Sequence, residues 1–224
     1  MNELNLFIEI FVLFTFVVLS KKLFGRDGVI AWIVLASVLA NVVQGKNATI
    51  FGLNAGIGHV LFSSTFLATD ILTEVYSHED AKKAVWLGFS ANLVFIVVMY
   101  IALRYLPSSI DTMNDNMSAL FGLNIRITAS SMFWYLISNF GDVYLYNKLR
   151  ILTNGKYLWL RNNVSTILFN CAENFGFAFF AFGGIYTVNQ ILEIAIASTV
   201  IEIIVGILDT PFLYIATGFK KGEE

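Results

Sequence analysis

Two apolar segments, SSMFWYLISNFGDVYLY (residues 130–146) and VSTILFNCAENFGFAFFAF (residues 164–182), decide how this chain folds. Each carries a carboxamide followed three residues later by a carboxylate: Asn139 and Asp142 in the first, Asn170 and Glu173 in the second. Residues i and i+3 share a face of a helix, so each pair points an amide and an acid the same way. An ionised group in such a helix is costly unless it faces a polar cavity or a partner. We therefore expect a polar site between these two helices.

The whole chain has the composition of an integral membrane protein. Of its 224 residues, 57% are hydrophobic and only 13% are charged, about half the charged share of a soluble domain. Several windows reach the roughly 20 apolar residues that a helix needs to cross the bilayer. We predict an all-α, polytopic fold in a single transmembrane domain over residues 1–224, with seven spans, or six as the alternative count. The spans are expected at residues 4–20, 28–43, 49–76, 84–106, 127–146, 164–185 and 190–219.

The basic residues predict how the chain is oriented, because short loops rich in Lys and Arg face the cytoplasm. With seven spans, most of the basic residues fall on one side of the membrane: Lys21, Lys22, Arg26, Lys82, Lys83, Lys148, Arg150, Lys156, Arg161, Lys220 and Lys221. Only Lys46, Arg104 and Arg126 fall on the other side. We therefore expect a multi-pass protein of the cell (plasma) membrane with the N-terminus outside and the C-terminus in the cytoplasm.

A further pair of acids closes the third predicted span, in FLATDILTEVY (residues 66–76). Asp70 and Glu74 share a helix face at a C-terminal helix end, where the helix dipole disfavours anions. Two interpretations stay open. The pair could form an ion-pair cluster with Lys82, Lys83 or the basic residues near Lys148, or it could form a wall or gate of the site.

Three other ionisable residues lie within the predicted spans. His59 is expected to be hydrogen-bonded to a neighbour. Glu202 lies near mid-depth and needs a partner, a proton or a cavity. Glu9, about one turn from the outer end of the first span, is expected to reach the headgroup level.

The amide and carboxylate pairs suit a neutral, planar molecule rich in hydrogen-bonding groups. Carboxylates accept from paired N–H donors, amides both donate and accept, and aromatic side chains stack on a ring. A guanine-like edge matches this set, whereas an inorganic anion would require basic residues at depth, and a bare cation would leave the amides unexplained. The predicted substrate-binding residues are Asn139, Asp142, Asn170 and Glu173, with Asp70 and Glu74 at the lower wall or gate.

Other classes of function are less compatible with the chain. The single cysteine, Cys171, and two well-separated histidines offer no nucleophile with a base and no metal site, so we expect no enzyme, no catalytic residues, no metal and no cofactor. Basic residues lie only at membrane flanks, which argues against nucleic acid as a partner. The expected partners are the lipid bilayer and a small-molecule substrate, and a homo-oligomer stays open. A proton or cation channel is also left open, with Asp70, Asp142, Glu173 and Glu202 as its relay.

The chain also resembles a known family, the queuosine precursor transporters, or vitamin uptake transporter family. The resemblance covers most of the chain, and ATDILTEVY and KYLWLRNN are its most specific segments. It is carried by GRDGVIAWIVLASVLAN (residues 25–41), FLATDILTEVY (66–76), AKKAVWLGFSANL (81–93), SNFGDVYLYNKLR (138–150), GKYLWLRNNVST (155–166) and LDTPFLYIA (208–216). It implies uptake of a 7-deazaguanine precursor, preQ0 or preQ1, of the modified tRNA bases queuosine and archaeosine. Uptake of another small planar heterocycle or vitamin is the alternative.

This sequence departs from the family pattern in two respects. The family commonly has Gln followed by Asp where this chain has Asn139 with Asp142 and Asn170 with Glu173. The spacing of each pair is kept, but both amides are shorter and the second acid is longer by one methylene. Family members are also usually predicted to have six spans, against the seven counted here.

Overall fold

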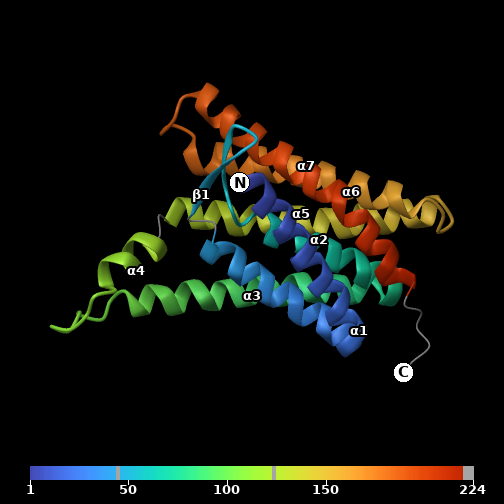
Figure 1. The fold of residues 1–224 in the computed structure, drawn as a ribbon, viewed down its shortest axis with the longest axis horizontal. Coiled ribbons are helices and arrows are strands. Elements are labelled where there is room, and N and C mark those ends of the chain that lie inside the picture. The colour runs from blue at the N-terminus through green and yellow to red at the C-terminus, as the bar shows by residue number, and fades with distance from the viewer. Residues whose placement is uncertain (44–45, 123–124, 219–224) are drawn as a thin grey trace.

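The structure is a computed structural model that describes residues 1–43, 46–122 and 125–218 (Figure 1). In this part of the chain the fold is helical apart from one two-stranded hairpin. The elements, in chain order, are α1 (Asn2–Val43), β1 (Asn47–Ile50), β2 (Leu53–Gly56), α2 (His59–Ile71), the π-helical turn η1 (Leu72–Tyr76), α3 (His78–Ala102), α4 (Asn114–Phe121), α5 (Ile125–Leu152), α6 (Leu158–Phe182) and α7 (Val188–Gly218). The long helices lie side by side as a bundle.

The first two predicted spans form α1, which folds back on itself at Gly25. This residue has φ 59° and ψ −140°, a backbone conformation that glycine adopts readily and other residues avoid. The rings of Phe16 and Trp32 stack with centroids 6.3 Å apart, whereas a straight helix would separate them by about 24 Å. The connection between the two spans is therefore helical except at Gly25, and the two halves of α1 are antiparallel (Figure 1).

The third predicted span is wrong in its first part, because residues 47–56 form a β-hairpin. β1 and β2 are antiparallel, with Ile50 opposite Leu53. The two residues of the turn, Phe51 and Gly52, both have positive φ, as tight hairpin turns require. Glycine is a poor helix former, and its recurrence up to Gly58 delays the helix. α2 therefore begins only at His59.

α2 lies at the centre of the bundle, surrounded by α1, α3, α5 and α7. Nearly every side chain on it is buried, so it has no lipid-facing side. Three of its buried hydroxyl groups are paired within the helix: Ser64, Thr65 and Thr69 each donate to a backbone carbonyl three residues earlier. The hydroxyl of Ser63 is buried without a partner among the described residues. Such bonds lower the cost of burying a helix that carries hydroxyl groups.

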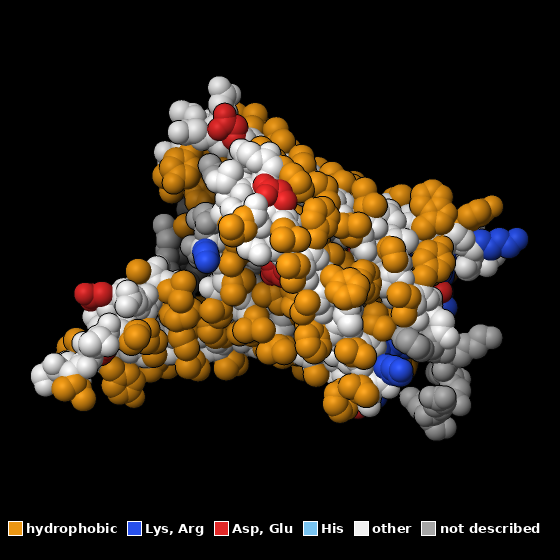
Figure 2. All heavy atoms as spheres, in the orientation of Figure 1, with side chains coloured by type: hydrophobic (Ala, Val, Ile, Leu, Met, Phe, Trp, Pro, Cys, Tyr) orange, Lys and Arg blue, Asp and Glu red, His pale blue; other side chains and the backbone are white. Residues whose placement is uncertain are grey.

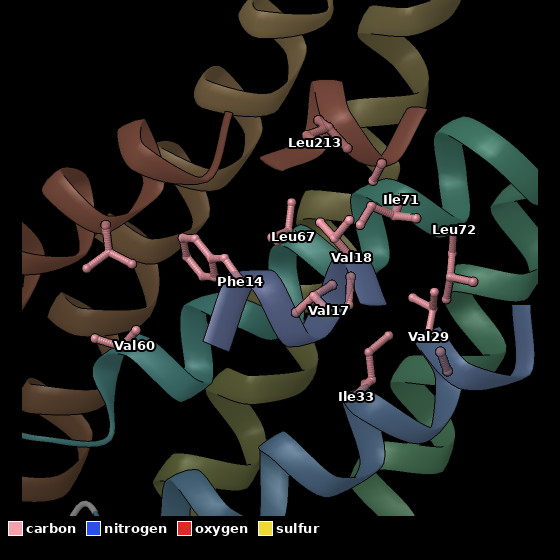
Figure 3. Close-up of a cluster of buried hydrophobic side chains, with 14 of the residues drawn as sticks. Phe14, Val17, Val18, Val29, Ile33, Val60, Leu67, Ile71, Leu72 and Leu213 are labelled. Atoms are coloured by element: carbon pink, nitrogen blue, oxygen red, sulfur yellow. The ribbon is translucent and has the colours of Figure 1, made fainter. Parts of the chain in front are cut away.

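An apolar core packs α2 against its neighbours (Figure 3). Phe14, Val17 and Ile33 from the two halves of α1 are completely buried. They meet Leu67 and Ile71 of α2 in one continuous cluster, which also reaches α7. Because this contact fixes α2 between α1 and α7, it also fixes the position of Asp70, the residue before Ile71.

The outer faces of the long helices are apolar, as expected for a protein surrounded by lipid (Figure 2). Four helices of the described part are long and apolar enough to cross a membrane, namely α1, α3, α6 and α7. α5 is not among them, because polar side chains are spread along its length. The structure therefore agrees with a helical membrane protein whose most polar long helix lies at the predicted site.

The basic residues gather at one end of the bundle, which we call the basic end (Figure 2). The reversal of α1 and the start of α3 meet there through Arg26 Nη1 and Asp80 Oδ1, 3.4 Å apart. Lys21 Nζ donates to the carbonyl of Ala216 near the end of α7, at 2.6 Å. The opposite end, which carries the β-hairpin, is called the hairpin end. Phe219, Lys220, Lys221 and the side chain of Arg126 lie outside the described residues.

Candidate functional site

The two segments that carry the amide and acid pairs are α5 and α6, and they pack closely against each other. The ring of Phe169 lies against Gly141, where an added Cβ would come within 2.0 Å of it. Seven residues away on α5, Trp134 lies against Gly176 of α6 in the same way. The two contacts set one antiparallel register. At about 1.5 Å per residue, this register places Asn139 and Asn170 at the same level.

Gly141→Ala tests whether this close approach holds α5 and α6 together. The added methyl group would overlap the Phe169 ring, and overpacking of a buried contact typically costs about 1–3 kcal/mol. We expect a lower midpoint of thermal unfolding in detergent. Gly206→Ala is the matched control on α7, since its Cβ would meet its nearest atom, Thr166 Cγ2, at an ordinary 3.6 Å. Equal midpoints for the two variants would contradict this role of Gly141.

All four residues predicted from these segments keep buried polar atoms without a hydrogen-bonding partner among the described residues. These atoms are Oδ1 of Asn139, Oδ2 of Asp142, Oδ1 and Nδ2 of Asn170, and Oε2 of Glu173. The first three residues are at most 1% exposed, so their side chains do not face lipid. Folded proteins pair roughly 90% or more of buried polar groups. A run of unpaired ones along a single helix interface is what a binding site for a polar ligand requires.

On the basic-end side of the amides lies a cluster of three aspartates from three helices. Asp70 of α2 is close enough to Asp142 of α5 and Asp209 of α7 for their charges to interact. Asn162 Nδ2 donates to Asp209 Oδ1 at 2.6 Å, and Thr166 Oγ1 donates to Asp142 Oδ1 at 3.4 Å. Both oxygens of Asp70 lack a donor among the described residues. This aspartate cluster thus borders the unpaired amide groups on their basic-end side.

On the hairpin-end side lies a second polar cluster, centred on Glu202 of α7. Its Oε1 lies 2.7 Å from Nδ1 of His59, the first residue of α2. Its Oε2 accepts from Nδ2 of Asn174 at 2.5 Å, and its charge interacts with that of Glu173. The prediction that His59 is hydrogen-bonded to a neighbour is confirmed, and Glu202 has the partner that its depth requires.

Glu74 lies next to the aspartate cluster, close enough for its charge to interact with that of Asp70, but it is engaged in an ion-pair network at the basic end. Its Oε1 lies 2.7 Å from Arg161 Nη2, and its Oε2 lies 3.6 Å from Arg150 Nε and accepts from the hydroxyl of Tyr146 at 3.2 Å. Of the two interpretations left open, the ion-pair cluster therefore describes Glu74, with Arg150 from the basic connection as one of its cations. Lys82 instead pairs with Glu79.

The sequence of this chain matches a known protein family over the region that contains the predicted site. The model of a family described as "putative vitamin uptake transporter" matches residues 56–216 of the chain. That match spans α2 to α7 and includes all six predicted site residues. The chain belongs to the vitamin uptake transporter family. The resemblance drawn from its sequence is thereby confirmed, and family membership makes this protein a membrane transporter and not an enzyme.

Two curated relatives of this vitamin uptake transporter carry more specific names. A protein of Bacillus subtilis (strain 168) named "Probable queuosine precursor transporter" is 37% identical over 212 residues, which cover 94% of this chain and 93% of the relative. The "Queuosine precursor transporter" of Escherichia coli (strain K12) is 24% identical over 168 residues, 71% of each chain. No solved structure matches this chain significantly.

Several residues of this transporter's polar clusters were not singled out from its sequence. Asn174 follows Asn170 by one helical turn, a spacing that marks it as a neighbour on the same face. Asn162 carries no such signal, because its partner Asp209 comes from a helix 47 residues away. Arg161 was counted among membrane-flank cations, yet its side chain is only 1% exposed. Its burial follows from the position of Glu74 on another helix.

Proposed function

We propose that this protein takes up a 7-deazaguanine precursor of queuosine or archaeosine, preQ0 or preQ1, across the plasma membrane. The single observation that carries the proposal is the set of unpaired buried polar atoms on Asn139, Asp142, Asn170 and Glu173. The names of the two relatives agree with this substrate class. The four residues would hold the base, with no cofactor involved.

The chemistry of these residues matches the edge of a 7-deazaguanine. Its ring N–H and adjacent amino group are neighbouring donors, and a carboxylate with a free oxygen, such as that of Asp142 or Glu173, accepts from such a pair. Its carbonyl and ring nitrogen need a donor and a second polar partner, which an amide such as Asn170 supplies. By the α5–α6 register, Asp142 and Glu173 are about 7–8 Å apart along the helix axes. The two amides lie between these acids, so a single base could form hydrogen bonds with Asp142 at one end and with Glu173 at the other.

We further propose separate roles for the two acids of α2 and η1. Asp70 has no donor of its own and adjoins Asp142, so it would form the lower wall of the site. Glu74 is already engaged by two guanidinium groups, so it would act as a latch that joins η1 to α5 and α6 at the basic end. Opening this latch would release the substrate on that side.

The orientation proposed for the transporter places the basic end in the cytoplasm and the N-terminus outside. The described basic residues at this end are Lys21, Lys22, Arg26, Lys82, Lys83, Lys148, Arg150, Lys156 and Arg161. Short loops with this excess of positive charge stay on the cytoplasmic side. Seven crossings, two of them supplied by α1, then place the chain termini on opposite sides of the membrane.

A panel of ligands tests the substrate class. We expect preQ0 or preQ1, added to the purified protein at about 100 times its dissociation constant, to stabilise it against thermal unfolding by about 2.7 kcal/mol. Riboflavin, thiamine and biotin form the comparison set, since the family description names vitamins. A shift with a vitamin and none with either 7-deazaguanine would replace the proposed substrate. Ion conductance in a planar bilayer without substrate would instead favour a proton or cation channel.

A further inference from the structure

A cavity of about 150 Å³ opens at the hairpin end. None of its lining residues belongs to the proposed substrate site of Asn139, Asp142, Asn170 and Glu173, which we call the deep site. It lies between the first turns of α1, the β-hairpin, the start of α2 and the middle of α7. Its polar lining residues are Asn2, Asn5, Glu9, Lys46 and His59. We call it the hairpin-end cavity. Asn2, Asn5, Glu9 and Lys46 precede residues 56–216, the part of the chain that the family match covers, whereas His59 lies within it.

The cavity offers one strong acceptor that is not in use. Glu9 is partly buried, and it has no hydrogen bond or ion pair to any residue that the structure describes. Asn5 stands one turn before it on the same face of α1. By comparison, Glu3 on the same helix accepts from the backbone N–H of Phe51 and belongs to the hairpin contact. Glu9 is therefore a carboxylate that lines a cavity and has no partner in the described part of the chain.

Donors come from the other side of the same cavity. Lys46 lies just before β1, and its ammonium group is within 4 Å of no carboxylate of the described chain. The first turn of α2 adjoins it, and the N-cap residue of this helix is Gly58, which has no side chain of its own to cap the turn. The N–H groups of such a turn lack acceptors within their own helix and favour a carbonyl oxygen or an anion.

His59 gives independent evidence that this cavity is built for a ligand. It lines the cavity and is 8% exposed, and its Nε2 is buried with no partner among the described residues. Its other ring nitrogen is held by Glu202, whose charge in turn interacts with that of Glu173. One side chain therefore lies between the hairpin-end cavity and the deep site.

The mixture of groups restricts what the cavity accepts. A simple anion would be repelled by Glu9, and a simple cation by Lys46. A neutral heterocycle can pair with both sides of the cavity at once: its adjacent N–H donors with Glu9 at one edge, and its carbonyl with Lys46 at the other. An enclosed space of about 150 Å³ is known to admit a single benzene ring. Because this cavity is partly open, the second ring of a flat bicyclic base could extend beyond its mouth.

We propose that the hairpin-end cavity is a second substrate site, in which Glu9 accepts from the ring N–H and amino group of a lactam-bearing heterocycle before the base passes His59 to the deep site. This inference rests on the proposed uptake of a 7-deazaguanine. It assigns Glu9 a binding role and makes transport a passage between two sites with different residues.

Equilibrium binding of preQ0, and of preQ1 in parallel, to the full-length protein in lipid nanodiscs tests this proposal. Wild type is expected to bind in two steps. D142N is expected to remove binding at the deep site and to leave the weaker binding step, at the hairpin-end cavity. Adding E9Q to D142N is expected to raise the dissociation constant of this remaining step about tenfold or more, because a charge-assisted hydrogen-bonded pair is lost. Glu193→Gln is the matched control, an exposed carboxylate in the first turns of α7 at the same end.

The outcomes separate the two proposals. Residual binding in D142N that E9Q weakens and E193Q does not supports the second site. Loss of all binding in D142N, with an unfolding midpoint equal to that of wild type, overturns it, as does residual binding that E9Q leaves unchanged. E173Q serves as a second deep-site variant if D142N unfolds. Absence of binding to wild type would remove the proposed function itself, before any variant is compared.

Discussion

Asp142→Asn and Glu173→Gln are each expected to abolish uptake of preQ0 and preQ1. Each change keeps the size of the side chain but replaces one carboxylate oxygen with an NH2 group, which would face the donors of the base. One hydrogen bond to a charged group is lost, at about 1.5–3 kcal/mol, and one donor of the base is left buried without an acceptor, at about 1–3 kcal/mol, so uptake should fall about 100-fold or more. The measurement is accumulation of labelled substrate in cells without their own transporter, divided by the amount of inserted protein.

Glu193→Gln again provides the control, since it removes an exposed carboxylate from α7 and should leave uptake unchanged. Equal membrane insertion of all three variants separates a binding defect from a folding defect. Wild-type uptake in both D142N and E173Q would remove these two residues from the site. Loss in only one of them would show that the base is held at one end of the site alone.

Arg161→Ala is expected to destabilise the protein more than any other single change at the basic end. The guanidinium group is 1% exposed and contacts both oxygens of Glu74. It also donates to the carbonyls of Gly155 and Lys156, which close the connection from α5 to α6. Breaking a buried ion pair by removing one partner costs about 3–5 kcal/mol. The unfolding midpoint and the yield of monodisperse protein should both fall.

Lys82→Ala is the matched control for Arg161, because Lys82 and Glu79 form an exposed pair within one helix. Such a pair contributes at most about 1 kcal/mol. Arg161→Lys should lie between the two, since a lysine keeps the charge but not the forked geometry of the guanidinium group. If the Ala variant at position 161 were as stable as K82A, the latch would contribute little to the fold.

The fold could be predicted from the sequence wherever a long apolar run ends in charged residues. This holds for α3, α6 and α7, and for α1 once its reversal at Gly25 is allowed for. It fails at residues 49–56, where an apolar window hides a hairpin. Hydropathy averages over such a window, whereas the turn at Phe51 and Gly52 depends on two backbone dihedral angles.

The candidate site was predictable in part, and the limit is physical. Asn139 with Asp142 and Asn170 with Glu173 are close in sequence, so helix periodicity alone aligns each pair. The pairing of His59 with Glu202 joins residues 143 positions apart. It depends on how α2 and α7 pack, which no local pattern records.

The central position of α2 has a consequence for how the protein is made. The helix spans only 13 residues and ends in a five-residue π turn, shorter than the roughly 20 residues that hold a lone segment in a bilayer. With Asp70 near its end, it gains little from contact with lipid tails. We expect a nascent chain halted after residue 76 to leave this segment outside the bilayer, and the segment to enter only once α3 has emerged from the ribosome.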